Sequence, residues 1–458
     1  MESRQDAQAA GESMFSVYRR RFRKHTLGKI GLALLVFFYL TALLADFLSP
    51  YDMTFTDKRK SYHPPANVYF MYDGPNGREF RPWVYEQRMV NAAFKEYGVI
   101  PTRSMRLVSV EPTPGARPLM SLSTAQTAPE RRDQLLAAAA QHYDFGPDSQ
   151  TARLIGDTMR RVEQDPDPDA RELITVATRE VGGRELTRSL WVVKGNRNFL
   201  GFFARGVPYR FLGLFTAHRH FVTSPTGGFY WLGTDLLGRD MASRLLHGGR
   251  VSLTVGLMGV AISFVLGLLI GGISGYFGGR VDNILQRFSE IIIAIPGLYL
   301  ILAIRAAFPP NLTSVQVYFL IVAIFAMIGW TSLARTVRGL ILSLKNEDYV
   351  MSARTMGLSR MKVIIRHILP NTMSYVIVSL TLSIPGYILG ESALSLLGLG
   401  ITEPQSSWGL MLSAARNTQV LTRAPWILIP GLLIFLAILA WNFFGDGIRD
   451  AVDPRSRH

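Results

Sequence analysis

The chain has 458 residues, of which 48% are hydrophobic and 18% charged, and it contains no cysteine. Soluble globular domains carry about 25% charged residues, so this composition favours a membrane protein. The missing cysteines exclude a disulfide framework and thiolate metal sites. The formal net charge of +15 would suit a nucleic-acid-binding protein, but the positions of the basic residues favour a membrane-orientation signal instead.

The N-terminal segment predicts a basic tail followed by a membrane anchor. Residues 1–29 are rich in Arg and Lys, and the apolar run Ile30–Leu48 follows directly. That run has about the length that spans a bilayer. It is longer than the apolar part of a signal peptide and no small-residue cleavage site follows it, so we expect a retained first span. Basic residues before a span hold the N-terminus in the cytoplasm.

The last half of the chain contains five further apolar segments, each long enough to cross a bilayer as a helix. A single segment of this kind could be a buried core helix, but six in one chain favour an all-α polytopic membrane protein. Many of the residues are small, which permits close helix packing in lipid. The five segments are 251–275, 289–308, 315–334, 372–397 and 426–445.

The charge distribution gives this topology an orientation. With the N-terminus inside and six crossings, the C-terminus is also inside, and residues 336–371 are cytoplasmic. That segment carries six basic residues against Glu347 and Asp348, whereas the predicted outer loops 307–314 and 398–425 hold few. The basic residues therefore lie where the positive-inside rule requires them, and nucleic acid is not needed to explain the net charge.

The long polar region after the first span predicts an inserted α/β domain outside the membrane. The stretches MRLVSVE (105–111) and RSLWVVKG (188–195) are rich in β-branched residues and predict strands. The stretches 131–143 and 151–164 predict helices. The alternative is a long, partly disordered loop, which the Pro/Asp-rich residues 163–170 favour.

The predicted organisation follows the chain from one end to the other. It consists of a cytoplasmic tail (1–29), a first span (30–48), an inserted domain (49–215), a membrane-proximal outer segment (216–250), a five-helix core (251–445) containing a cytoplasmic loop (336–371), and a cytoplasmic tail (446–458).

The sequence contains no signature of an enzyme. It has no P-loop, no HExxH and no nucleophile elbow, and its histidines, including His63, lack ligand spacing and are interpreted as surface or interface residues. We expect no catalytic residue, metal or cofactor. Ionisable residues near the ends of the spans are pathway or gate candidates, namely Glu290, Arg305 and Glu391. For Glu391 a structural ion pair or hydrogen bond is the favoured interpretation, and the absence of acids near the midplane argues against a secondary transporter.

Residues 347–370 predict a short helix–turn–helix joined to the fifth span. In the first helix the apolar residues Tyr349, Val350, Ala353 and Met356 share a stripe, and Gly357 ends it with an unusual backbone angle. Ser359 fits the N-cap of a second helix, with Met361, Ile364, Ile365 and Ile368 toward one side, and Pro370 is expected to stop it. Such helices suit docking into a groove of a partner protein; the alternative is a helix pair lying on anionic lipid.

This segment resembles the coupling loop, or EAA motif, of ABC-importer membrane subunits. Met351 and Ser352 stand where the family has Glu and the first Ala, whereas Ala353, Gly357, Leu369 and Pro370 match. DYV before the motif and HILPN at its end are similar to the dipeptide/oligopeptide/nickel permease branch. The resemblance implies that the residues contacting the ATPase are Tyr349, Met351, Ser352, Ala353, Gly357, Leu358, Leu369 and Pro370.

Further stretches are similar to the same branch, in its order: residues 232–253, 275–282, 391–400, 406–412 and 445–455, with the first span and LSPYD (48–52). They cover about 1–55 and 215–458. The region 56–215 is longer than the family's linker and is a departure from it. The first of these stretches contains an expected outer-face motif, made of Gly233, Asp235, Gly238, Arg239 and Asp240.

The resemblance implies a type I ABC-importer fold and a multi-pass protein of the prokaryotic cytoplasmic membrane. A homologous permease subunit would complete the pore, two ATPase subunits would grip the 347–370 segment, and an external solute-binding protein would deliver di- or oligopeptides. One alternative is the same machine importing nickel or another small solute. The other is a membrane-anchored sensor that acts through its external domain.

Overall fold

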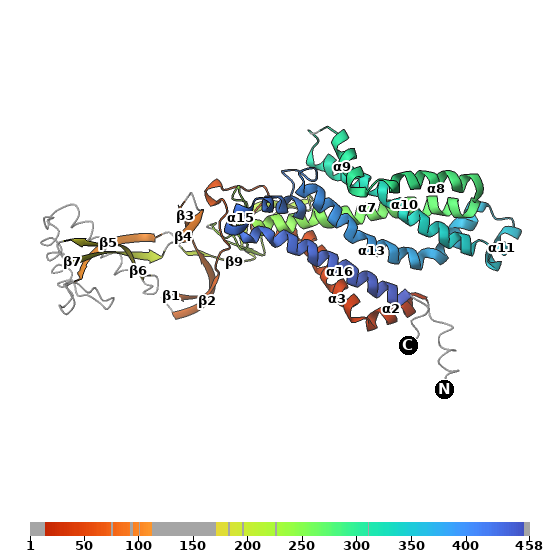
Figure 1. Ribbon diagram of the computed structural model, residues 1–458. Helices are drawn as coiled ribbons and strands as arrows, with labels where there is room; N and C mark the ends of the chain where they lie inside the picture. The colour runs from red at the N-terminus through yellow and green to blue at the C-terminus, as the bar shows by residue number, and fades with distance from the viewer. Residues whose placement is uncertain are drawn as a thin grey trace. The chain divides into compact units, whose positions relative to one another are not determined.

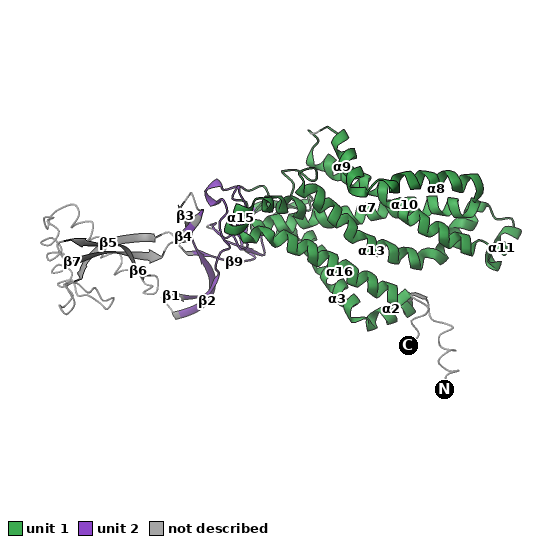
Figure 2. Ribbon diagram, in the orientation of Figure 1, with its two compact units in different colours: residues 1–55, 208–217, 239–458 green, residues 56–207, 218–238 purple. Residues whose placement is uncertain are grey.

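The computed structural model describes residues 14–74, 77–91, 95–99, 101–111, 171–181, 184–194, 197–224, 227–309 and 311–452. The chain divides into two compact units (Figure 2). Unit 1 consists of Met1–Phe55, Pro208–Ala217 and Arg239–His458, and unit 2 of Thr56–Val207 and His218–Gly238. The predicted helices 131–143 and 151–164 and the Pro/Asp-rich stretch 163–170 lie outside the described residues.

Five helices of the described residues are long and apolar enough to cross a membrane, and they correspond to five of the six predicted spans. They are α3 (Thr26–Leu43), α7 (Met241–Phe277), α10 (Ser314–Leu344), the helix Arg360–Leu396 that ends in α13 (Leu369–Leu396), and Pro425–Val452, which contains α16 (Ile429–Val452).

The segment predicted as a straight third span is bent. It consists of α8 (Gly279–Ala294) and α9 (Gly297–Ala307), which meet at 87° and make a sixth span only if the pair is counted as one (Figure 1). The break lies at Ile295, whose backbone is extended, and Pro296. Proline disfavours helical geometry in the residue before it and donates no backbone hydrogen bond, so the helix ends there.

The spans of unit 1 pack around α7 and α13. Helix α7 contacts α10 along its length and also contacts α13, and α16 contacts both α3 and α13 (Figure 1). Small residues allow this approach: a Cβ added to Gly271 would lie 2.5 Å from the carbonyl oxygen of Ala334, and one added to Gly275 would lie 2.9 Å from that of Arg338. These glycines therefore set the spacing between α7 and α10.

Shorter helical pieces connect or extend the spans. Their bounds are α2 (Met14–Lys24), α4 (Ala45–Leu48), η1 (Lys58–Lys60), α11 (Asp348–Thr355), α12 (Arg360–Val363), a π-helical turn (Ile364–Ile368), α14 (Trp408–Leu412), η4 (Ser413–Arg416), α15 (Thr418–Arg423) and η5 (Pro425–Leu428).

The strands of the described residues lie, in sequence, between the first span and α7. Two three-stranded sheets have the orders β1-β2-β8 and β5-β7-β6, and two-stranded sheets pair β3 with β4, β9 with β12, and β10 with β11. The two stretches predicted as strands are confirmed as β5 and β7. The bounds are β1 (Tyr69–Gly74), β2 (Gly77–Tyr85), β3 (Gln87–Asn91), β4 (Glu96–Val99), β5 (Pro101–Glu111), β6 (Arg171–Val181), β7 (Arg184–Lys194), β8 (Arg197–Phe199), β9 (Gly201–Phe202), β10 (Arg205–Phe211), β11 (Phe215–Arg219) and β12 (Val222–Thr223).

Unit 2 buries His63, which the sequence analysis interpreted as a surface or interface residue. His63 is buried, with its ring 4.7 Å from that of Tyr97 and 5.3 Å from that of Tyr230. Burial, together with the nearby Lys60, lowers the pKa of His63 to about 4, so the imidazole is neutral at pH 7. A small apolar cluster of Val84, Leu200 and Phe229 lies in the same unit.

Candidate coupling and transport site

The 347–370 segment is held to the spans by its buried apolar residues. Val350 and Ala353 of α11 and Ile364 and Ile368 of the π turn belong to one core cluster with Ile341 of α10. That cluster continues into α13. The segment is therefore packed onto two spans at once, and a displacement of α11 without movement of α10 and α13 would open the core.

Gly357 makes the turn between α11 and α12. Its φ is +80°, as the sequence predicted, and its amide donates to the carbonyl of Arg354 (3.0 Å). The next amide, of Leu358, donates to the carbonyl of Ala353 (3.3 Å). A Cβ at position 357 would meet nothing within 4 Å, so the requirement for glycine comes from the backbone angle alone.

Pro370 does not stop the second helix, and that prediction is wrong. The helix continues from Arg360 to Leu396 through the π turn, where the amide of Leu369 donates to the carbonyl of Ile364. Pro370 lies in the first turn of α13, and the amide it lacks is accommodated by the wider turn before it. Ser359 occupies the predicted N-cap position, but its side chain makes no capping hydrogen bond.

The predicted apolar stripes divide between the core and the surface. Val350, Ala353, Ile364 and Ile368 are buried. The other stripe residues, together with Met351 of the predicted coupling residues, form what we call the exposed set, in which Met356 is 73% exposed. The exposed set is Tyr349, Met351, Met356, Met361 and Ile365.

The remaining predicted coupling residues also divide. Ser352 is exposed and its hydroxyl donates to the carbonyl of Asp348 (2.8 Å), and Pro370 is exposed. Leu369 is buried, and Leu358 is partly buried against the same cluster. The surface of the segment also carries basic side chains, namely Arg354, Arg360, Lys362 and Arg366. Apolar anchors beside basic residues are what a groove on an acidic partner would bind.

An ion pair links helices at the end of the bundle where the 347–370 segment packs. Asp282 of α8 accepts two hydrogen bonds of 2.6 Å from Nε and Nη2 of Arg338 on α10. The Ser274 hydroxyl of α7 also donates to Asp282 (2.5 Å). The sequence pattern GYFGGRVD assigned no role to this aspartate, and the available signal was a lone acid in a glycine-rich stretch between apolar helices. The bidentate pair joins α8 to α10, and the Ser274 hydrogen bond adds α7 to the same contact.

Glu391 lies at the opposite end of α13, fully buried in a hydroxyl network. Its carboxylate accepts from the Ser395 hydroxyl (2.7 Å) and the Ser252 hydroxyl (3.1 Å). Each serine in turn accepts a backbone amide, of Ile401 and Trp408 respectively (both 3.1 Å). The two sequence stretches 391–400 and 406–412 are thereby tied to α7. These contacts fit a hydrogen-bonded structural role, and a pathway role remains a prediction.

The other two gate candidates each bond elsewhere. Arg305 is buried near the end of α9 and its Nε donates to the carbonyl of Leu399 (3.0 Å). Glu290 is exposed on α8 and pairs with Arg287 at 2.8 Å. An exposed i,i+3 pair contributes little to stability. In these contacts, each of the three candidates therefore has different partners.

A cavity of about 400 Å³ lies between α7, α9, α10 and α13. The hydroxyl groups of Ser263 and Tyr387 are hydrogen-bonded at 2.7 Å on its wall. Ser332 and Ser383 line it as well, beside apolar residues. Sequence reasoning missed these residues because it searched for charges. Small and hydroxyl residues recurring at helical spacing along α13 were the available signal.

The expected outer-face motif builds turns and a helix cap. In unit 2, Gly233 and Gly238 have φ of +77° and +74°, and a Cβ on Gly238 would lie 1.8 Å from the carbonyl oxygen of Asp57. Asp235 accepts the amide of Leu237 (2.8 Å). In unit 1, Asp240 caps α7 by accepting the amide of Ser243 (2.7 Å), and Arg239 pairs with Glu403 at 2.7 Å. A role beyond these contacts remains a prediction.

Comparison with protein families gives two matches. A model described as the inner membrane component of binding-protein-dependent transport systems matches residues 264–458. A second, described as the N-terminal transmembrane domain of oligopeptide transport permease C, matches residues 13–65. Residues 66–263 lie between the two matched ranges.

Similar proteins include several permeases. The oligopeptide transport system permease protein OppC of Haemophilus influenzae is 44% identical over 232 residues, which are 50% of this chain and 72% of that protein. The dipeptide transport system permease protein DppC of Bacillus subtilis is 39% identical over 234 residues, 51% of this chain and 71% of that protein. The glutathione transport system permease protein GsiD of Pectobacterium atrosepticum is 41% identical over 227 residues, 49% of this chain and 73% of that protein.

Proposed function

Because this chain belongs to the family of binding-protein-dependent transport system inner membrane components, as a permease subunit of an ABC importer, we propose that it forms half of the pore of a peptide importer and couples to separate ATPase subunits through residues 347–370. Family members of this kind are pore components rather than enzymes. The names of the relatives, which refer to oligopeptide, dipeptide and glutathione transport, support a peptide as the cargo.

The observation that carries the coupling role is the division of the 347–370 segment into a buried and an exposed apolar half. Its buried half, including Val350 and Ile368, is part of the core formed with α10. Its continuous helix into α13 gives a stiff connection. A partner that pulls on the segment would therefore move two spans, as transmission of a power stroke requires.

The exposed set provides the contact with that partner. Three of its five members are methionines, whose flexible thioethers adapt to an apolar groove. The neighbouring Arg and Lys residues would complement acidic groups at the rim of such a groove. An amphipathic pair lying on lipid would be the alternative.

The cavity lined by Ser263 and Tyr387 supports a pathway role for α13. Its lining combines hydroxyl groups with glycine and apolar side chains, which suits passage of a polar solute without a tight binding site. A homologous permease subunit would complete the pore, and an external solute-binding protein would supply the peptide. In this arrangement both termini lie in the cytoplasm, and the membrane is a prokaryotic cytoplasmic membrane.

The test replaces Met356 with Asp in the full chain, co-expressed with its partner permease and ATPase subunits. A charge placed in the apolar interface should sharply reduce the ATPase recovered with the permease and abolish coupled transport. Folding should be unchanged, because the side chain is 73% exposed. Met71→Asp is the matched control, since Met71 is also exposed but lies in unit 2. Normal recovery and normal transport by Met356→Asp would overturn the coupling role.

A further inference from the structure

The turn between β10 and β11 exposes apolar side chains. Residues 211–215 read FLGLF, and Leu212, Leu214 and Phe215 are all exposed, Leu214 to 79%. Water would surround these side chains if the turn lay in solution. A turn of this composition is unusual, since hairpin turns normally carry polar residues or glycine.

The backbone of this turn holds a large apolar residue in a conformation that glycine usually occupies. Leu212 has φ of +50° and Gly213 has φ of +75°. Few non-glycine residues adopt such angles, and those that do are mostly Asn or Asp. A leucine kept in this position, with its side chain exposed, is better explained by a contact it makes than by the needs of the turn.

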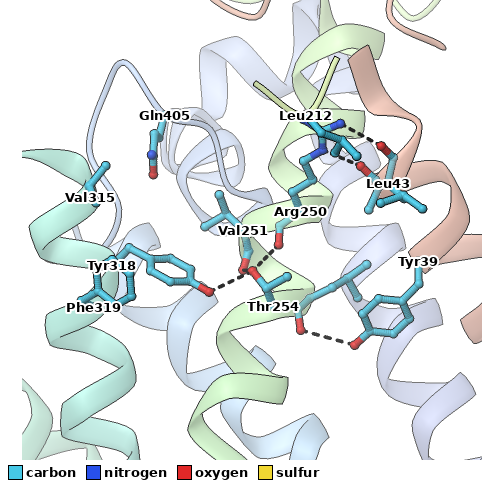
Figure 3. A pocket seen from close by; sticks show the side chains of 12 residues that line it. Tyr39, Leu43, Leu212, Arg250, Val251, Thr254, Val315, Tyr318, Phe319 and Gln405 are labelled. Carbon is cyan, nitrogen blue, oxygen red and sulfur yellow. Dashed lines mark hydrogen bonds between the residues drawn. The ribbon is translucent and has the colours of Figure 1, made fainter. Parts of the chain in front are cut away.

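Contacts within unit 1 fix the position of the turn relative to the spans. The amide of Leu212 donates to Oδ2 of Asp46, just beyond the end of α3 (2.9 Å). The same carboxylate accepts two hydrogen bonds of 2.9 Å from Arg250 of α7. Arg250 also donates to the carbonyls of Ala42 and Leu43 (Figure 3).

This ion pair marks the edge of the apolar zone. Arg250 is followed directly by the apolar run that begins at Val251, and Asp46 follows the end of α3 at Leu43. It lies at the end of α7 opposite the coupling segment, because Gly272, near the other end of α7, is the residue that faces Ile364. The turn is therefore placed at the boundary between hydrocarbon and water on the side opposite residues 347–370.

A groove of about 490 Å³ continues from Leu212 into the spans (Figure 3). It is lined by Tyr39 and Leu43 of α3, by Thr254 of α7, and by Tyr318 and Phe319 of α10. Val315 and Phe319 on its rim are exposed, so the groove opens where lipid surrounds the spans. The lining is mostly apolar, and its polar groups are the hydroxyls of Tyr39, Thr254 and Tyr318, the guanidinium of Arg250 and the side-chain amide of Gln405.

We propose that the 211–215 turn dips into the outer half of the bilayer and closes the end of a groove that holds a phospholipid acyl chain. Residues 208–217, the part of this hairpin that belongs to unit 1, contain Arg210 and no acidic residue, and Arg210 next to the turn is exposed. A basic residue beside an apolar insertion suits the phosphate level of a bilayer. The 211–215 turn would thus bind the membrane whether or not cargo or an ATPase subunit is bound.

The test uses the natural lack of cysteine in the chain. Single variants Leu214→Cys, Phe37→Cys and Gln419→Cys are labelled with a small fluorophore in the full chain, reconstituted into vesicles without any other protein. Phe37 is an exposed residue of the α3 span and serves as the lipid reference, whereas Gln419 is exposed on α15 and serves as the aqueous reference. Quenching by phospholipids that carry a nitroxide on the acyl chain is compared with quenching by iodide in the buffer.

The label at position 214 should lose its fluorescence to the nitroxide lipid about as strongly as the label at 37, and should resist iodide. Iodide quenching equal to that at position 419, with no lipid quenching, would overturn the proposal. The proposal also fails if the label becomes protected only after a solute-binding protein is added, because the turn would then be a protein-docking surface. None of these quenching results depends on coupling to an ATPase, so failure of this proposal leaves the proposed function untouched.

Discussion

The two ends of α13 are built in opposite ways. At the end that follows the 347–370 segment, apolar side chains that precede α13, such as Met356 and Ile365, are exposed. At the other end, Glu391 and its serine partners are buried and hydrogen-bonded to one another. Both stretches match the same family pattern in the sequence. Under the proposed function, the pattern records two kinds of constraint, one for a partner outside the chain and one for the chain's own assembly.

The strongest test of this division compares two isoleucines on one helical turn. Ile368 is 0% exposed and Ile365 is 53% exposed. Ile368→Ala should destabilise the permease by about 3 kcal/mol, since it leaves a cavity in the core, whereas Ile365→Ala should change stability by less than about 0.5 kcal/mol. Unfolding in detergent measures the first effect, and recovery of the ATPase subunits measures the loss expected for Ile365→Ala. Equal destabilisation by both would mean that the exposed half is part of the core.

A second test concerns the buried network. Glu391→Ala should cost about 2 kcal/mol of folding stability, because the hydroxyls of Ser252 and Ser395 lose their acceptor. Glu391→Gln keeps a carbonyl acceptor and should be much milder. Glu290→Gln, at an exposed site, should have no measurable effect on unfolding.

The pathway interpretation of Glu391 differs in the expected effect on transport. If the carboxylate contacts the solute, Glu391→Gln should reduce peptide uptake while leaving the unfolding temperature unchanged. The measurement is peptide uptake into vesicles, made with wild-type and variant protein that show the same elution profile in size-exclusion chromatography. A loss of uptake in Glu391→Gln would support the pathway interpretation, and normal uptake would support the structural one.

Sequence reasoning located the spans because their apolar runs are long, but it could not locate their breaks. The run around IIIAIPGLYL is apolar on both sides of Pro296, so hydropathy alone gives one span where the structure has an 87° bend. Pro370 produced the opposite error. A proline is tolerated in the first turn of a helix, and the π turn before it allows the helix to continue.

The candidate site was predictable to a similar degree. The angle at Gly357 follows from a glycine between two amphipathic stretches, and it is confirmed. Which apolar residues face the core could not be derived, because a two-turn helix such as α11 buries only Val350 and Ala353 and leaves Tyr349 exposed. The Asp282–Arg338 pair depends on contacts between distant segments, which no local pattern contains.

The mildest of the three destabilising substitutions is expected at Gly357. Gly357 and Gly339 each have no atom within 4 Å of an added Cβ, but only Gly357 has a positive φ, of +80°. Gly357→Ala should therefore strain the turn by about 1 kcal/mol, whereas Gly339→Ala, inside α10, should be neutral or slightly stabilising. If the turn sets the angle at which α11 meets the ATPase, Gly357→Ala should lower peptide uptake per ATP hydrolysed, and Gly357→Pro should lower it further. The ratio of uptake to hydrolysis is measured for all three variants in vesicles of the same composition. An unchanged ratio in Gly357→Ala and Gly357→Pro, compared with Gly339→Ala, would show that coupling through residues 347–370 does not depend on this turn.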